Sequence, residues 1–194
     1  MGGTFNPIHN GHLTLAKVAF RQLKLDEVLF VPCGMPYMKV GQKIASAKDR
    51  VKMTALAIQD IPEFTLSTVE IEQQGNTYTY VTLEHLKTQN PDTEYYFIVG
   101  ADSLFHMTQW ACPERIFANC CVLAAVRNDK TDLDMERQIH FLKERYHADI
   151  RLLQTECMDI SSSDIRRRVH QGEPIGRDVP KAVREYIERK GLYQ

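Results

Sequence analysis

Gly2-Gly3-Thr4-Phe5-Asn6-Pro7-Ile8-His9-Asn10-Gly11-His12 is the stretch that decides the fold of this chain. Its two adjacent glycines allow the backbone to approach a ligand closely and tolerate a positive φ. Apolar periodicity begins at Leu13, so the stretch leads into the first turn of a helix. Free N–H groups and the helix dipole attract phosphate at such a point. We therefore interpret the stretch as the phosphate site of a nucleotide-handling enzyme.

Outward from this stretch, helices and apolar strands alternate along the chain. Leucines and alanines at helical spacing predict a helix over residues 11–24, and Val28-Leu29-Phe30-Val31 reads as a strand buried on both faces. Further strands are predicted at residues 64–71, 95–99, 120–126 and 150–153. This alternation favours an α/β fold with a doubly wound parallel sheet and helices on both faces. We expect one domain over residues 1–194, with an α/β core to about 158 and a small C-terminal helical region over about 159–194.

The predicted sheet raises one difficulty at its first strand. A glycine-rich loop of this kind should follow a strand, yet only Met1 precedes Gly2. We therefore expect either that the chain begins upstream or that the first, central strand is truncated. Ligands in such sheets bind at the carboxyl ends of strands, which makes Gly100-Ala101-Asp102-Ser103 and Arg127-Asn128 candidate contacts.

Composition excludes several classes of protein. The 24 basic and 25 acidic residues give a net charge of −1, so the chain has no basic field for nucleic acid. The five cysteines include no C-x-x-C pair, which argues against a disulfide framework or a zinc site and favours reduced thiols in the cytoplasm. No signal peptide or long apolar run is evident, so we expect neither secretion nor a membrane span.

His9 and His12 are the first candidates for chemistry. They lie three residues apart at the predicted junction of loop and helix, where both could face one ligand. Imidazole can donate to phosphate oxygens. A zinc site is the alternative, but it needs a third ligand, and the pattern H-E-x-x-H is absent.

A second candidate anion site lies near the other end of the chain, in Asp159-Ile160-Ser161-Ser162-Ser163-Asp164-Ile165-Arg166-Arg167-Arg168. Three hydroxyls at a helix start, followed by an arginine, can bind an anion. We assign Ser161 to Ser163 and Arg166 to function, and Arg167 and Arg168 to a solvated basic face. The chain thus has two helix N-termini that are suited to bind an anion, at opposite ends of its sequence.

Taken together, the two motifs resemble those of the nucleotidyltransferase superfamily with the H-x-G-H signature. Within it, the chain resembles the bacterial nicotinate-nucleotide adenylyltransferase family, and the resemblance covers essentially all of the chain. The landmarks between the motifs agree: Gly75-x-x-Tyr78-Thr79, Phe97-Ile98-Val99-Gly100-Ala101-Asp102, Trp110 and Tyr186-Ile187-x-x-x-Gly191-Leu192-Tyr193.

The resemblance implies a Rossmann-like fold and a reaction of NAD biosynthesis. ATP and nicotinate mononucleotide would give deamido-NAD and pyrophosphate, with the phosphate of the mononucleotide as nucleophile. Mg²⁺ would enter with ATP, carried by its phosphates rather than by a protein metal site. The expected partners are these two nucleotides, with no nucleic acid and no membrane; a homo-oligomer is left open.

The resemblance also assigns roles to residues. The expected catalytic residues are His12, His9 and Arg166, with His12 stabilising the transition state. The residues expected to bind ATP are Gly2, Gly3, Thr4, Gly11, Lys39, Gly100, Asp102, Arg127, Ile160, Ser161 and Ser162. The residues expected to bind the mononucleotide are Phe5, Thr77, Tyr78, Thr79 and Trp110. Backbone N–H groups of residues 77–79 would bind the nicotinate carboxylate. Trp110 would stack on the nicotinate ring, although a tryptophan of the core is the alternative.

This sequence departs from the family pattern at three places. Asn6 replaces a common Asp, which we expect to be tolerated. Pro36-Tyr37-Met38-Lys39 replaces Pro-Pro-His-Lys and leaves only Lys39 to meet phosphate. Ala111 follows Trp110 where an aromatic residue is common, which predicts a looser ring pocket.

Two other functions compete with this prediction. A phosphopantetheine adenylyltransferase of the same superfamily would be shorter and would lack Trp110 and the landmark from Gly75 to Thr79. A non-catalytic nucleotide-binding regulator would not need the intact His9, His12 and Arg166.

Overall fold

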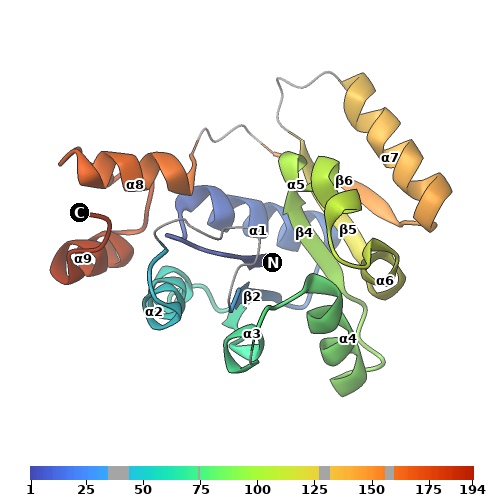
Figure 1. Ribbon diagram of the computed structural model, residues 1–194, viewed down its shortest axis with the longest axis horizontal. Helices are drawn as coiled ribbons and strands as arrows, with labels where there is room; N and C mark the ends of the chain where they lie inside the picture. Colours follow the sequence, from blue (N-terminus) through green and yellow to red (C-terminus); the bar gives the residue numbers. More distant parts are fainter. Residues whose placement is uncertain (35–43, 74, 127–131, 156–159) are drawn as a thin grey trace.

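The computed structural model describes residues 1–34, 44–73, 75–126, 132–155 and 160–194 (Figure 1). The predictions made for Lys39, its neighbours Pro36 to Met38, and Arg127 lie outside the described residues.

Parallel strands form the centre of the molecule. The strands are β1 (Gly2–Gly3), β2 (Val28–Pro32), β3 (Phe64–Leu66), β4 (Tyr96–Gly100), β5 (Cys121–Val126) and β6 (Ile150–Gln154). Hydrogen bonds join them in two parallel sets, in the orders β1-β2-β3 and β4-β5-β6. β1 lies beside β4, since a Cβ atom on Gly2 would be 3.6 Å from Cε2 of Phe97. The spatial order is therefore 3-2-1-4-5-6, and the predicted doubly wound, Rossmann-like fold is confirmed.

The strand that the glycine-rich loop requires is present, and it is short. Gly2 and Gly3 of β1 align with Val31 and Pro32 of β2. The amide of Val31 donates to the carbonyl of Met1 at 3.0 Å, and the amide of Cys33 donates to the carbonyl of Gly3 at 2.9 Å. These bonds hold the loop at the carboxyl ends of β1 and β2.

Helices cover the strands, and the first of them follows the apolar periodicity predicted for residues 11–24. The helices are α1 (Asn10–Leu23), α2 (Ala47–Ile58), α3 (Val69–Glu72), α4 (Thr79–Gln89), α5 (Ala101–His106), the 3₁₀ helix η2 (Met107–Gln109), α6 (Pro113–Asn119), α7 (Asp132–Tyr146), α8 (Ser162–His170) and α9 (Lys181–Lys190). Ser46 caps α2 as its sequence indicates, because its hydroxyl accepts from the amide of Asp49 at 3.1 Å. Of the helices in the described ranges, none combines the length and apolar character needed to cross a membrane.

One predicted element is wrong. The strand expected over residues 64–71 ends at Leu66, and Val69–Glu72 forms the short helix α3. The amide of Ser67 donates to the carbonyl of Phe30, and the chain then turns away from the sheet. This turn buries the carboxyl group of Glu70 against α4, a tertiary contact that local strand propensity does not reveal.

Two apolar cores lie on the two halves of the molecule. One lies among β1–β3, α1, α2 and the C-terminal helices and extends onto β4–β6 through Ile98, Leu123 and Leu153, and the other lies among β4–β6 and helices α4–α7. α9 packs on α2, where the hydroxyl of Tyr186 donates to Asp49 at 2.8 Å. Figure 1 shows α8 and α9 at one end of the molecule, beside α2 and one end of α1.

Candidate active site

The start of helix α1 joins the two histidines to each other. His9 is the N-cap residue, with an extended backbone at φ −146°. Its amide donates to Nδ1 of His12 at 3.2 Å, and the two imidazole rings stack with centroids 3.7 Å apart. Because Nδ1 of His12 accepts this hydrogen bond, the proton of a neutral His12 imidazole resides on Nε2. The helix start therefore fixes both the orientation and the tautomer of His12.

His9 is buried and electrically neutral near pH 7. Burial lowers its pKa to about 4, although the nearby carboxylate of Asp178 acts in the opposite direction. Within the described residues its Nδ1 atom is buried and has no hydrogen-bond partner. A buried polar atom of this kind is costly unless water or a ligand satisfies it. A Cβ atom on Gly11 would lie 3.0 Å from this nitrogen, so glycine leaves room for the ring.

Phe5 supports the same helix start from the core side. It adopts a positive φ of 48°, its side chain is only 2% exposed, and its ring meets that of His12 edge-on. A Cβ atom on Gly3 would lie 2.9 Å from the Phe5 ring, which explains the second glycine of the motif. Since the ring is in the core, any contact between Phe5 and a mononucleotide would come from its backbone.

Helix α8 brings the second motif onto the first. The guanidinium of Arg166 donates to the carbonyl of Asn6 at 2.9 Å, and the hydroxyl of Ser162 donates to the carbonyl of Pro7 at 2.9 Å. Ile160 lies against Gly11, 3.8 Å from a Cβ atom placed there. The structure therefore unites the two motifs at one place, although more than 150 residues separate them in the sequence.

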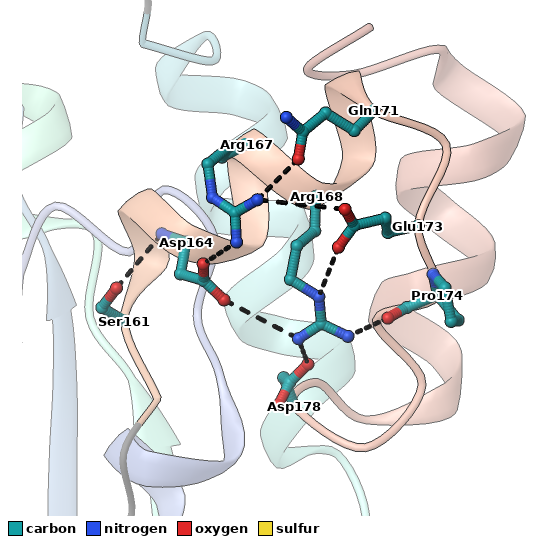
Figure 2. Close-up of polar contacts among 8 residues, drawn as sticks. All are labelled: Ser161, Asp164, Arg167, Arg168, Gln171, Glu173, Pro174 and Asp178. Carbon is teal, nitrogen blue, oxygen red and sulfur yellow. Dashed lines mark hydrogen bonds and ion pairs between the residues drawn. The ribbon is translucent and has the colours of Figure 1, made fainter.

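Arg167 and Arg168 lie in a surface network of ion pairs (Figure 2); Arg167 is exposed, as the sequence predicts for a solvated face, whereas Arg168 is half-buried. Arg167 pairs with Asp164, and Arg168 pairs with Asp164, Glu173 and Asp178. This network also reaches helix α1, because the carbonyl of Asp178 accepts from the Asn10 amide at 2.7 Å. Ser161 caps α8 by accepting from the Asp164 amide at 3.1 Å.

A cavity of about 1120 Å³ lies beside β1. Predicted site residues in its wall are Gly2, Gly3, Thr4, Thr77, Thr79 and Trp110. Trp110 packs edge-on against Phe97, with ring centroids 6.1 Å apart, and is half-buried. The tryptophan thus belongs to the core on one side and to the cavity on the other. Tyr78 is the N-cap of α4, and its ring stacks on that of Tyr80.

Gly100 and Asp102 lie at the carboxyl end of β4, as predicted. Gly100 caps helix α5, and Asp102 is in its first turn; both are exposed. A Cβ atom on Gly100 would meet no protein atom within 4 Å. Protein packing therefore does not require glycine at this position.

Two buried charged residues at the site were not predicted from the sequence. Arg50, which is 2% exposed, donates to the carbonyls of Thr4, Gly34 and Ala45. Glu70 is 8% exposed and accepts from the hydroxyl of Thr82 at 2.8 Å. The signal for Arg50 was its helical spacing. It stands in register with the buried residues Met53, Thr54, Ala57 and Ile58 of α2.

Comparison with known proteins identifies the family of this site. Residues 1–168 match the model of the cytidylyltransferase-like family, so the chain belongs to this class of nucleotidyltransferases. The chain is 44% identical to a protein of Lachnoclostridium phytofermentans named "Probable nicotinate-nucleotide adenylyltransferase", over 100% of this chain and 96% of the relative. A protein of the same name from Clostridium botulinum is 40% identical, with the same coverage. Within its class, the chain therefore belongs to the nicotinate-nucleotide adenylyltransferases.

A solved structure supports the fold. The nicotinic acid mononucleotide adenylyltransferase of Plasmodium falciparum, in complex with NaAD, superposes with a TM-score of 0.78 at 20% identity. The match covers 99% of this chain and 94% of that chain. The predicted family and fold are confirmed, as is the prediction of an adenylyltransferase of NAD biosynthesis.

Proposed function

We propose that this chain transfers the adenylyl group of ATP to nicotinate mononucleotide between the joined starts of helices α1 and α8. An oxygen of the mononucleotide phosphate attacks the α-phosphorus of ATP; one P–O bond forms, the bond to the β-phosphate breaks, and pyrophosphate leaves. The observation that carries the proposal is the contact of Arg166 and Ser162 with the backbone of the His9-x-Gly11-His12 loop. Catalysis then rests on aligning two anions and stabilising negative charge.

The α1 side supplies hydrogen-bond donors. His12 has Nδ1 engaged by the His9 amide, so its Nε2–H is the donor for an oxygen of the transferred phosphoryl group. The orphaned Nδ1 of His9 takes a hydrogen bond from a ligand or from a water that the ligand orders. Gly2, Gly3, Thr4 and Gly11 bring the backbone near the phosphates.

The α8 side supplies a permanent positive charge. Arg166 meets the β- and γ-phosphates of ATP, together with Ser161, Ser162 and the backbone at Ile160. Gly100 and Asp102 lie at the strand ends where the adenosine would bind. Lys39 and Arg127 complete the ATP contacts in this proposal, on the ground of the family resemblance alone.

The cavity beside β1 receives the mononucleotide. Trp110 in its wall stacks on the nicotinate ring, and the backbone amides of Thr77, Tyr78 and Thr79 bind the nicotinate carboxylate at the start of α4. An amide in place of this carboxylate would lose the favourable charge at the helix N-terminus. The site therefore favours the acid over the amide form.

Mg²⁺ fits this arrangement as an ion held chiefly by ATP. Among the described residues, no group of three or more His, Cys, Asp and Glu side chains could hold a metal ion. Mg²⁺ commonly keeps several waters and binds to substrate phosphates with few protein ligands. When bound, it would neutralise charge on the phosphates, while the residues above orient them. We also place the enzyme in the cytoplasm, as a single domain over residues 1–194.

Turnover with alternative substrates tests this proposal. Pyrophosphate release is measured with ATP and nicotinate mononucleotide, with the amide mononucleotide, and with phosphopantetheine. We expect turnover to be fastest with the acid mononucleotide. Activity with phosphopantetheine only would instead identify the rival transferase, and binding without any turnover would identify a nucleotide-binding regulator.

The single tryptophan offers a second, independent measurement. Titration with nicotinate mononucleotide should quench the fluorescence of Trp110, and the amide form should do so only at higher concentration. Unchanged fluorescence at concentrations that saturate turnover would contradict the stacking of Trp110 on the ring.

A further inference from the structure

Arg50 ties the glycine-rich loop to a second segment. Arg50 lies on helix α2, where its Nη1 donates to the carbonyl of Thr4 at 2.9 Å and its Nη2 donates to the carbonyl of Gly34 at 2.8 Å. Nε donates to the carbonyl of Ala45 at 3.2 Å. These acceptors are neutral backbone groups rather than carboxylates, so the guanidinium serves to hold backbone segments in place.

Glu70 continues the connection on the other side of Gly34. The hydroxyl of Thr82 donates to its carboxyl group at 2.8 Å, and the nearby hydroxyl of Thr77 and amide of Gly34 oppose the rise in the pKa of this carboxyl group that burial causes. Gly34 has no room for a side chain, since a Cβ atom there would lie 2.3 Å from the carbonyl oxygen of Glu70. Gly34 is thus held by Arg50 through its carbonyl and packs directly against the backbone of Glu70.

The two halves form one buried chain of contacts. Hydrogen bonds join Thr4, next to the phosphate-binding glycines, to Arg50 and Arg50 to Gly34. Gly34 then packs against Glu70 and against Thr77, whose methyl group would lie 2.9 Å from a Cβ atom on Gly34 and which starts the segment assigned to the nicotinate carboxylate. The three side chains in this chain of contacts are shielded from water, since Arg50 is 2% exposed, Glu70 8% and Thr77 6%. Buried networks of this kind that are satisfied throughout hold their members rigidly.

We infer that Arg50 and Glu70 are positioning residues that fix the distance between the ATP subsite and the mononucleotide subsite. This inference rests on the proposed function, because it assumes that Thr4 and Thr77 flank the two substrates. Each subsite would remain intact without the connection, but the reacting phosphate and the α-phosphorus would be less well aligned. Misplacement by about 1 Å can cost on the order of a hundredfold in rate.

Four variants test the inference: Arg50→Lys, Glu70→Gln, the double variant, and Thr54→Val as control. Arg50→Lys keeps the charge but loses the planar fork that spans several carbonyls. Glu70→Gln keeps one acceptor oxygen and the shape of the side chain. Thr54 lies one turn along α2 and donates to the carbonyl of Arg50 at 2.8 Å, so its loss weakens the same helix without cutting the chain of contacts.

We expect a separation of kcat from KM. In each single variant kcat should fall by about tenfold or more, while KM for ATP and for the mononucleotide should each change by less than about threefold. The double variant should be no more than about twofold slower than the slower single variant, because both substitutions break one connection. Thr54→Val should lower Tm and leave kcat within about twofold of the unmodified enzyme.

Three results would overturn the inference. One is an increase in KM for a single substrate with unchanged kcat, which would show that the residue acts at one subsite only. Another is a decrease in kcat of the double variant that equals the product of the decreases in the two single variants. The third is a fall in Tm with unchanged kcat. The unmodified enzyme is assayed first; its inactivity with ATP and nicotinate mononucleotide would contradict the proposed function, whereas the results above concern only the positioning residues.

Discussion

Helices α1 and α8 both begin at the proposed triphosphate site, but they begin in different ways. α1 starts from a buried histidine, His9, whose amide is bound by His12. α8 starts from an exposed serine, Ser161, and carries Arg166 one turn further on. The first start offers two imidazoles that are fixed by each other and by the core, of which the buried His9 is neutral near pH 7, and the second offers the guanidinium group of Arg166. The two helix starts should therefore respond differently to substitution, pH and salt.

The largest effect should come from His12→Ala. Removal of the Nε2–H donor from the transition state should reduce kcat by about tenfold to a hundredfold, with little change in folding stability. His12→Asn is the matched variant, because its side-chain oxygen can still accept from the His9 amide. Steady-state kinetics should show a similar loss for both variants. Full activity of either variant would remove His12 from the chemistry.

Arg166→Met should have the next largest effect. Loss of a charge-assisted contact with phosphate should lower kcat/KM for ATP by about 10- to 30-fold, through a higher KM or a lower kcat. Arg167→Met is the control on the neighbouring surface position, where the side chain pairs with Asp164 instead. Equal losses in the two variants would show that the general positive charge of α8, and not the place of Arg166, is what matters.

The neutrality of His9 predicts a pH effect on stability. Its pKa is lowered by burial to about 4 in the folded protein, against 6.5 for an unperturbed histidine. The unfolded state therefore binds more protons between these values, and stability is lost as the pH falls below about 6.5. From pH 7.5 to pH 5.5 the loss should be about 1.4 kcal/mol relative to His9→Asn.

Urea unfolding at the two pH values measures this difference. Burial also lowers the pKa of the Met1 amino group, to about 5, but this group titrates in both proteins and cancels in the comparison. An identical pH dependence of the two proteins would show that His9 does not titrate as a buried neutral group.

The smallest effect should come from Arg168→Met, in the surface network of Figure 2. Its side chain is 23% exposed and pairs with Asp178, so its loss should cost about 0.5–1 kcal/mol of unfolding free energy. kcat should stay within about threefold, and 0.5 M salt should narrow the stability difference. A loss of activity as large as that of Arg166→Met would instead assign Arg168 to the phosphate site.

The sequence predicted those features that depend on local pattern. Helical spacing located α1, and the capping serine Ser46 located the start of α2. The motif also predicted a basic face exposed to solvent, on which Arg167 lies. The meeting of the two motifs was predicted through the family resemblance, since no local rule places Arg166 on the carbonyl of Asn6.

What the sequence did not reveal depends on contacts between distant segments. The strand expected to run to residue 71 ends at Leu66 because the following turn is held by tertiary contacts of Glu70. Arg50 was missed because an arginine on a helix is usually exposed. Its spacing on α2 matches that of the buried residues, but the carbonyls of Thr4 and Gly34 that accept from it belong to segments distant in the sequence, which no pattern within α2 indicates.

The contact of the last helices with the first loop has a consequence for synthesis of the protein. Asn6 accepts from the hydroxyl of Tyr193 at 2.8 Å, and Asn10 donates to the carbonyl of Arg177 at 2.9 Å. A nascent chain leaves the ribosome N-terminus first, but a domain folds as a unit. The glycine-rich loop is therefore synthesised first, whereas its contacts with α8 and Tyr193 can form only after residues 160–193 have been made. A chain truncated before this segment lacks Arg166 and also loses the C-terminal side chains that pack in the core beside β2 and β3.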